Sequence, residues 1–411
     1  MFKFDISSVA LAFVISSAPL AAAPLGLDEA AELALNNQPL LAGQQSAIKA
    51  AEQNAVAASQ LPDPKLTGGL KDYPVTGSDA LSFTRDNFTM LTVGVSQEFP
   101  RQEKRRLRGV REQLDAQQKA QELDLMQRTI RRDAALAWLD VFYPEQAMQL
   151  VRALQKESQI QIESLGIAYR AGKKSQADVL GENVTLDLLR DREAEYAKRA
   201  ALARAALSRW IGEAADLPVS EALPELPEPP SLQRVLQQAE NHPHLNNLSK
   251  QVEAAQNEVA LARQAYKPDV RVDVYYGARP AFSDFIGVQV GVDLPLFTKN
   301  RQDRNLSSRL ALLDKSQSLK EDASRAIKAE VRRYYAEWSS AEERTARYFD
   351  KAILPQARQR LEAAVAAYQS GRVDLASVLE ARRAELDLQL QRLALQVDAA
   401  KAAVQLRWFL E

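Results

Sequence analysis

Residues 169–180 read YRAGKKSQADVL, and residues 368–379 read YQSGRVDLASVL. The two segments share a tyrosine, a glycine three residues later and a Val-Leu pair at the same distance from that glycine. A glycine at this position suits the left-handed turn that joins two antiparallel helices. Two such turns, about 200 residues apart, predict an internal tandem repeat of helical hairpins.

Other short segments recur at a similar separation and in the same order. They are Asn37-Gln38-Pro39 with Asn241-His242-Pro243, Pro62-Asp63 with Pro268-Asp269, Val93-Gly94-Val95 with Val290-Gly291-Val292, and Arg209-Trp210 with Arg407-Trp408. We therefore predict a first copy (residues 24–216) and a second copy (residues 231–411). Residues 217–230 contain five prolines, which predict a stiff, extended linker between the copies.

The composition limits the class of protein. Of 411 residues, 53 are basic and 54 are acidic, and this balance argues against a nucleic-acid partner. Cysteine is absent, which excludes disulfides, thiolate metal sites and a lipid attached to cysteine. The sequence contains only two histidines and no nucleophile motif. We therefore expect no catalytic residues, no cofactor and no metal site, and hence no enzyme.

Residues 1–23 predict a secretory signal peptide. Lys3 precedes an apolar run over residues 9–20, and three alanines follow at positions 21–23. The run is too short to span a bilayer, and small residues suit cleavage. No later stretch has the length and hydropathy of a transmembrane helix. If the mature chain enters a membrane, it must therefore do so as a β-barrel.

Each copy has the same predicted order of elements: a first helix, two strands, a very long helix, the glycine turn and a closing helix. The predicted helices cover residues 28–60, 102–165 and 176–212 in the first copy, and 232–266, 302–368 and 374–410 in the second. Pro144 and Pro355 predict irregularities in the long helices. Leucines at heptad-like spacing, such as Leu379, Leu386 and Leu390, predict coiled-coil pairing.

The helix lengths indicate how the helices are arranged. At 1.5 Å per residue, each long helix reaches roughly 100 Å. The two shorter helices of a copy together reach about 110 Å. Two short helices placed end to end are therefore about as long as one long helix. They can pack beside it over its full length and form a layer of uniform height.

The strands alternate between apolar and polar residues in hairpins 65–99 and 269–297. Lengths of about nine to twelve residues suit a tilted membrane-spanning strand. The alternative is a small soluble sheet covered by helices. In the membrane interpretation, the lipid-facing residues are Leu91, Val93, Val95, Val270, Val272, Val274, Ile286, Val288, Val290 and Val292.

Four strands cannot close a barrel, because a barrel needs about eight or more strands and an open edge in lipid is very costly. The chain must then share a barrel with identical copies. Two copies would supply eight strands and a filled interior, whereas three would supply twelve strands and leave room for a pore. The strand count leaves both possibilities open.

The duplicated order of helix, hairpin, long helix, glycine turn and helix resembles the TolC-like outer membrane efflux channels over essentially the whole mature chain. Three features resemble the heavy-metal branch of that family, the CzcC-like channels of cobalt–zinc–cadmium exporters. These features are residues 61–66 (LPDPKL), residues 96–100 (SQEFP) leading to Lys104-Arg105, and the two Tyr-x-x-Gly turns.

The resemblance implies a homotrimer, with a twelve-stranded barrel in the outer membrane of a Gram-negative bacterium above an α-helical tunnel in the periplasm. It also implies docking at the Tyr-x-x-Gly end with a periplasmic adaptor (membrane fusion) protein and an inner-membrane pump of the resistance-nodulation-division type. The chain would then be a passive exit duct for divalent heavy-metal cations. Two alternatives are a duct for drugs or secreted proteins and, in another class, a periplasmic coiled-coil adaptor or scaffold.

The residues around the two glycine turns are candidates for the periplasmic tip and its gate. Threefold symmetry would turn any inward acidic residue into a ring of three charges that filters cations. The alternative role is helix capping, with Ser175 and Asp178 as a capping box and Asp374 as an N-cap. The candidates are Tyr169, Arg170, Gly172, Lys173, Asp178, Glu182, Tyr368, Gly371, Arg372, Asp374 and Glu380.

Overall fold

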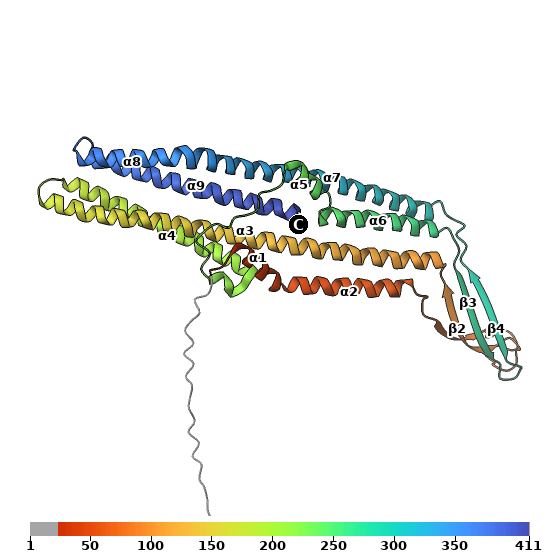
Figure 1. The fold of residues 1–411 in the computed structure, drawn as a ribbon. Helices are drawn as coiled ribbons and strands as arrows, with labels where there is room; N and C mark the ends of the chain where they lie inside the picture. Colours follow the sequence, from red (N-terminus) through yellow and green to blue (C-terminus); the bar gives the residue numbers. More distant parts are fainter. Residues whose placement is uncertain (1–23, 411) are drawn as a thin grey trace, which may run out of the picture.

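A computed structural model describes residues 24–410 and shows long helices side by side, ending in a small antiparallel sheet (Figure 1). The predicted signal peptide, residues 1–23, lies outside the described residues. The first copy contains α1 (Leu27–Asn36), α2 (Pro39–Ser59), β1 (Lys65–Lys71), β2 (Met90–Phe99), α3 (Gln102–Arg170), α4 (Gln176–Ile211) and the 3₁₀ helix η1 (Gly212–Asp216). The second contains α5 (Leu232–Ala239), α6 (Pro243–Gln264), β3 (Val270–Ala278), β4 (Phe285–Val292), α7 (Gln302–Glu343), the π-helix η2 (Arg344–Ile353), α8 (Leu354–Gln369) and α9 (Leu375–Leu410).

The first helix of each copy is two helices, so the prediction of unbroken helices over residues 28–60 and 232–266 was wrong. Pro39 and Pro243 are the first residues of α2 and α6. Proline has no backbone N–H to donate, and it disfavours helical geometry in the residue before it. It therefore ends the preceding helix and begins the next one with a change of direction.

The long helices respond differently to their prolines. The 69-residue α3 runs without a break through Pro144. In the second copy, ten residues of π-helix stand immediately before α8, which contains Pro355 near its start. The missing N–H and the ring of a proline disturb the preceding turn, and the wider π turn accommodates that disturbance.

The helices form an open row rather than a closed bundle. Near the sheet the order of contacts is α2, α3, α6 and α7, and near the glycine turns it is α4, α3, α9 and α8. Over the described chain, the two outermost helices, α2 and α7, share no substantial contact. The end-to-end arrangement predicted from helix lengths is confirmed, because α2 and α4 both pack along α3 (Figure 1).

The sheet repeats the order of that row. Its strands run β1-β2-β3-β4, every neighbouring pair is antiparallel, and β2 joins the two copies to each other by pairing with β3. Each strand continues into the helix at the corresponding place in the row. Among the described strands, β1 and β4 each have one unpaired edge.

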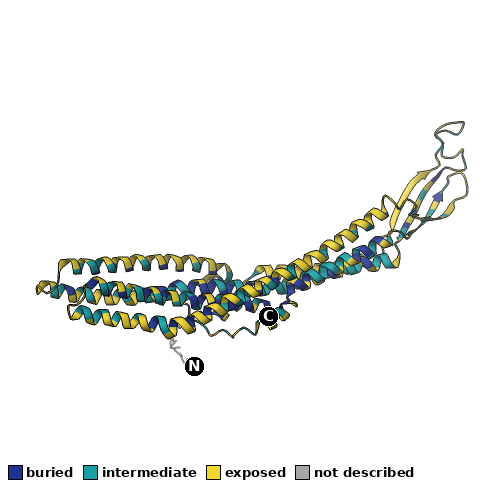
Figure 2. Cartoon of the chain, turned by 90° about the horizontal axis from the view of Figure 1, so that it is seen from above, coloured by how far each residue is buried: buried dark blue, intermediate teal, exposed yellow. Residues whose placement is uncertain are grey.

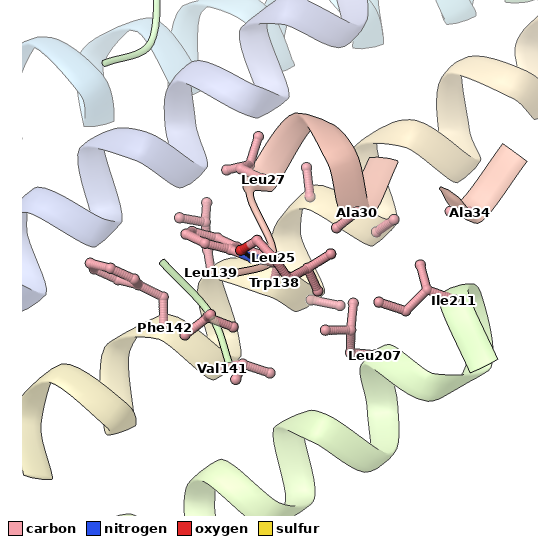
Figure 3. Close-up of a cluster of buried hydrophobic side chains, with 14 of the residues drawn as sticks. Leu25, Leu27, Ala30, Ala34, Trp138, Leu139, Val141, Phe142, Leu207 and Ile211 are labelled. Atoms are coloured by element: carbon pink, nitrogen blue, oxygen red, sulfur yellow. Dashed lines mark hydrogen bonds between the residues drawn. The ribbon is translucent and has the colours of Figure 1, made fainter. Parts of the chain in front are cut away.

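The main core lies at the middle of the row, where α1, α3, α4, α9 and the linker meet (Figure 3). Trp138 is fully buried there, and its indole nitrogen donates a hydrogen bond of 2.9 Å to the carbonyl of Leu25. Leu25 also pairs with Val219 of the linker in a parallel β-bridge. Burial decreases toward both ends of the molecule, and the sheet is largely exposed (Figure 2). The core therefore holds the helices together at the middle of the molecule, and the exposed residues lie mainly toward its two ends.

Candidate functional site

The sheet presents one continuous apolar face to solvent. The pairing register sets Val95 opposite Val274, and Val274 opposite Val288. Because side chains alternate across a strand, residues that pair directly point to the same face. The side chain of Val288 is 67% exposed. A row of exposed valines across several strands is an apolar surface that water solvates poorly.

The structure places the predicted lipid-facing residues on this one face. The register aligns Val93 with Tyr276 and Ile286, and it aligns Val270 with Val292. Strand β1 contributes Leu66 and Leu70 to the same face, where they pair with Val95 and Leu91. The face is thus four strands wide. None of the described helices has the length and hydropathy needed to cross a lipid bilayer.

The opposite face of the sheet has a feature that the sequence reasoning did not identify. The ring of Tyr275 lies over Gly287, and a side chain at Gly94 would come within 2.7 Å of the Cβ atom of Tyr275. The three residues are neighbours on β2, β3 and β4. An aromatic ring that covers cross-strand glycines compensates for their missing side chains. The alternating glycines in the sequence could have indicated such a feature. The residue that covers them, Tyr275, can be identified only from the pairing register of the strands.

A polar contact at Asp269 joins the sheet to the helices and was also not predicted. The Asp269 carboxylate accepts a hydrogen bond of 3.0 Å from the Arg101 backbone N–H and one of 2.6 Å from Lys104. Lys104 also donates to the carbonyl of Lys267 at 3.1 Å. This contact links the start of α3 in the first copy to the start of β3 in the second copy. It is well placed to fix the angle between sheet and helices.

The two glycine turns lie together at the opposite end of the molecule (Figure 1). Gly172 and Gly371 have φ values of +71° and +73°, the left-handed conformation that favours glycine. The ammonium group of Lys174 lies 3.6 Å from the centroid of the Tyr368 ring. This cation–π contact connects the two turns. An apolar cluster of Leu165, Leu375 and Val378 supports it from behind.

Both predicted capping residues cap helices in the structure. Ser175 and Asp178 form a reciprocal capping box at the start of α4. Asp374 accepts hydrogen bonds from the backbone N–H and the hydroxyl of Ser377 at 3.1 and 2.9 Å. These bonds hold the pKa of the Asp374 carboxyl below its usual value. The two copies thus use the same serine–aspartate pair in opposite order. A gating role for Asp178 or Asp374 stays a prediction.

The remaining tip candidates are spread between buried and exposed positions. Glu182 is completely buried and accepts a hydrogen bond from Ser158, so its carboxylate is withdrawn from the surface. Glu380 is exposed and forms an ion pair of 3.0 Å with Arg360. Tyr169 is exposed, whereas its counterpart Tyr368 lies beneath Lys174. The other candidates (Arg170, Lys173 and Arg372) are exposed at the turns.

We expect Asp374→Ala to fray the first turn of α9 and Asp374→Ser to preserve it. Loss of an N-cap costs about 1 kcal/mol, which corresponds to about fivefold faster exchange of the first-turn amide hydrogens. Serine occupies the equivalent position at the start of α4 and can cap without a charge. Hydrogen–deuterium exchange over residues 375–378 would measure the difference. Equal exchange in the two variants would contradict the capping role.

His242 is a structural residue at the break between α5 and α6. Its Nδ1 accepts a hydrogen bond of 3.3 Å from the backbone N–H of His244, which caps α6. The ring lies 4.4 Å from the Trp408 ring. Burial, with smaller contributions from the charges of Arg128 and His244, lowers the pKa of His242 to about 4.

The lowered pKa of His242 predicts a loss of stability in mild acid. The unfolded chain protonates this imidazole near its ordinary pKa of 6.5, and the folded chain does so near 4. Between these pH values the unfolded state binds more protons, so the free energy of unfolding falls as the pH falls from 6.5 to 4. The loss reaches up to about 3 kcal/mol.

The variant His242→Gln tests this prediction, because the first copy has Gln38 at the same place. We expect chemical unfolding followed by circular dichroism to show a flatter pH dependence in this variant than in the wild type. His244→Gln, two residues away at an exposed position, should keep the wild-type slope. A wild-type slope in His242→Gln would exclude His242 as the cause.

Comparisons with known proteins agree with this geometry. Residues 235–410 match the family model "Outer membrane efflux protein". The fold is similar to CusC, whose structures concern transmembrane channel formation (TM-score 0.77, 17% identity, 93% of this chain and 91% of that chain). It is also similar to a membrane protein from Pseudomonas aeruginosa (0.80, 16%, 93% and 90%) and to the outer membrane protein VceC from Vibrio cholerae (0.72, 19%, 92% and 95%). No curated protein sequence matches the chain.

The chain therefore has the fold of the outer membrane efflux channels. The match to the family model lies within the second copy, at residues 235–410. The expectation that the chain is not an enzyme agrees with these matches, because such channels are not enzymes. The heavy-metal branch is a finer assignment than these matches support.

Proposed function

We propose that this chain is one subunit of a homotrimeric outer membrane channel, the exit duct of a tripartite efflux system. The observation that supports the proposal most strongly is the sheet, with its exposed apolar face and an unpaired edge on both β1 and β4. An unpaired edge cannot persist in lipid, because each free backbone N–H or C=O group there costs several kcal/mol. Pairing β4 of one copy with β1 of the next removes every edge.

The open row of helices supports the same assembly. Near the sheet, its outermost helices are α2 and α7, and short connections join them to β1 and β4, the two strands that each have an unpaired edge. One threefold operation would therefore close both the row and the sheet. Three copies give twelve strands, which leaves room for a pore, whereas eight strands are filled by side chains. The duct would span the outer membrane of a Gram-negative bacterium at the sheet and extend into the periplasm along the helices.

The tip formed by the two glycine turns is the proposed contact site for a periplasmic adaptor and, through it, an inner-membrane resistance-nodulation-division pump. We further propose divalent heavy-metal cations as the exported solute. Support for this assignment comes from residues 61–66 and 96–100 and from the two Tyr-x-x-Gly turns. In this mechanism the pump supplies the energy, and the chain supplies a path through the outer membrane.

Cell fractionation and electrophoresis test the channel proposal. We expect trimers that dissociate only on heating, recovered in outer-membrane fractions. A chain that stays monomeric in the soluble periplasmic fraction would instead indicate a coiled-coil scaffold or adaptor. Deletion of the gene tests the solute: sensitivity to zinc, cobalt or cadmium is expected, and sensitivity restricted to drugs would assign a drug duct.

A further inference from the structure

The charge of the tip is opposite in sign to that of the whole chain. We define the tip as residues 169–178 and 368–377, the two glycine turns with the first turns of α4 and α9. It contains the cations Arg170, Lys173, Lys174 and Arg372 and the carboxylates Asp178 and Asp374, a net charge of +2. The full chain has a net charge of −1. Three copies would bring a net charge of +6 to one end of the duct.

The two tip carboxylates are directed into their own helices. Asp178 accepts from the Ser175 backbone N–H at 3.0 Å and from the Ser175 hydroxyl at 2.8 Å. Asp374 accepts from Ser377 in the same manner. A capping carboxylate keeps its charge, but its oxygens accept hydrogen bonds from backbone N–H and hydroxyl groups of its own helix. Neither carboxylate forms an ion pair with a tip cation within the described residues.

The tip cations form fewer polar contacts than the tip carboxylates. Arg170, Lys173 and Arg372 are exposed, and the structure of residues 24–410 shows no ion pair for their side chains. Lys174 faces the Tyr368 ring, which leaves its charge uncompensated by a carboxylate. These cations stand at the end of the proposed duct, where any solute that enters must pass.

The nearest carboxylates beyond the tip do not cancel this charge. Glu182 is buried against Ser158, and Glu380 is paired with Arg360. The exposed Glu163 and Glu362 lie about seven residues back along α3 and α8, or roughly 10 Å at 1.5 Å per residue. That separation is about one Debye length at physiological salt, so their field at the turns is strongly screened.

We propose that the tip favours anions over cations and is the charge filter of the duct. This inference rests on the proposed channel function. The proposed selectivity for anions is the opposite of the cation selectivity that rings of acidic residues at the tip would give. Free divalent cations would meet a repulsive entrance, so metal ions would need delivery by the docked pump assembly or passage as anionic complexes. The same field opposes their return to the periplasm.

Reversal potentials in planar bilayers under a potassium chloride gradient test the proposal with purified trimers. The wild-type channel should be more permeable to chloride than to potassium. The double variant Arg170→Glu/Lys173→Glu should lower the chloride-to-potassium permeability ratio, because a change of one kT in the local potential alters that ratio about sevenfold. Asp374→Ser, which retains the cap and removes a negative charge, should move the ratio the other way.

The matched control is Lys315→Glu/Lys320→Glu, the same change of charge at two exposed positions of α7. These residues lie roughly 70 Å from the tip along the helix axis, so the permeability ratio should stay at the wild-type value. Cation preference in the wild type, or equal shifts in tip and control variants, would overturn the inference while leaving the channel intact. If purified protein forms no conducting trimers at all, the channel proposal itself fails.

Discussion

Replacing Val288 with arginine is expected to abolish the trimer in the outer membrane. Val288 lies near the middle of β4, and the register aligns it with Val274 and Val95 on the exposed apolar face. An arginine on the lipid face of a barrel costs about 2–4 kcal/mol at the bilayer midplane. Threefold symmetry repeats the substitution, so the total reaches roughly 6–12 kcal/mol per trimer.

The neighbouring position provides the control for Val288. Gln289 points to the opposite face and pairs with Asp273, so Gln289→Arg places the same side chain beside a carboxylate and away from lipid. We expect this variant to assemble normally. Recovery of heat-modifiable trimers from outer-membrane fractions measures both variants. Normal trimers in Val288→Arg would mean that the apolar face does not meet lipid.

Replacing Trp138 with alanine is expected to destabilise the middle of the molecule by about 3–5 kcal/mol, as truncation of a large buried aromatic residue does. Trp138 is fully buried and stacks on Phe142 with a centroid distance of 5.3 Å (Figure 3). Most of the loss comes from the cavity. The Leu25 carbonyl keeps a second hydrogen bond, of 3.2 Å, from the backbone N–H of Ser220.

Two further variants separate the cavity from the hydrogen bond at Trp138. Trp138→Phe retains most of the ring and loses the indole N–H, so a smaller cost of about 1–2 kcal/mol is expected. Trp210→Ala removes a half-buried tryptophan at the margin of the same core and should also cost less than Trp138→Ala. Urea unfolding followed by circular dichroism would rank the three. An unfolding midpoint in Trp138→Ala equal to that of the wild type would contradict this account of the core.

Local patterns were sufficient to predict most of the elements. Alternation over residues 285–292 identified β4, because a strand with two different faces needs a period of two. The glycines at 172 and 371 identified the turns, because few other residues adopt positive φ. The prolines at 39 and 243 were visible in the sequence, yet the breaks they cause were missed because the apolar periodicity continues on both sides.

The two glycine turns proposed as the tip are neighbours in the structure, but the contacts around them could not be predicted from the sequence. The sequence alone left Asp178 and Asp374 open between gating and capping, and the geometry shows that both at least cap helices. The sequence could not reveal that Lys174, in the first repeat of the chain, lies over the ring of Tyr368 in the second repeat. That contact joins residues almost 200 positions apart, and no local spacing encodes it.

The sequence by itself determined most of the helices and the strands with their two faces, because each depends on residues within a few turns of one another. It also determined the duplication, because similar segments recur in the same order about 200 residues apart. The tertiary structure alone decided the order of the row and the pairing of β2 with β3. It also decided the burial of Trp138 against Leu25 and the juxtaposition of the two tip turns. These features depend on which distant surfaces bury each other, and a periodicity along one chain leaves that choice open.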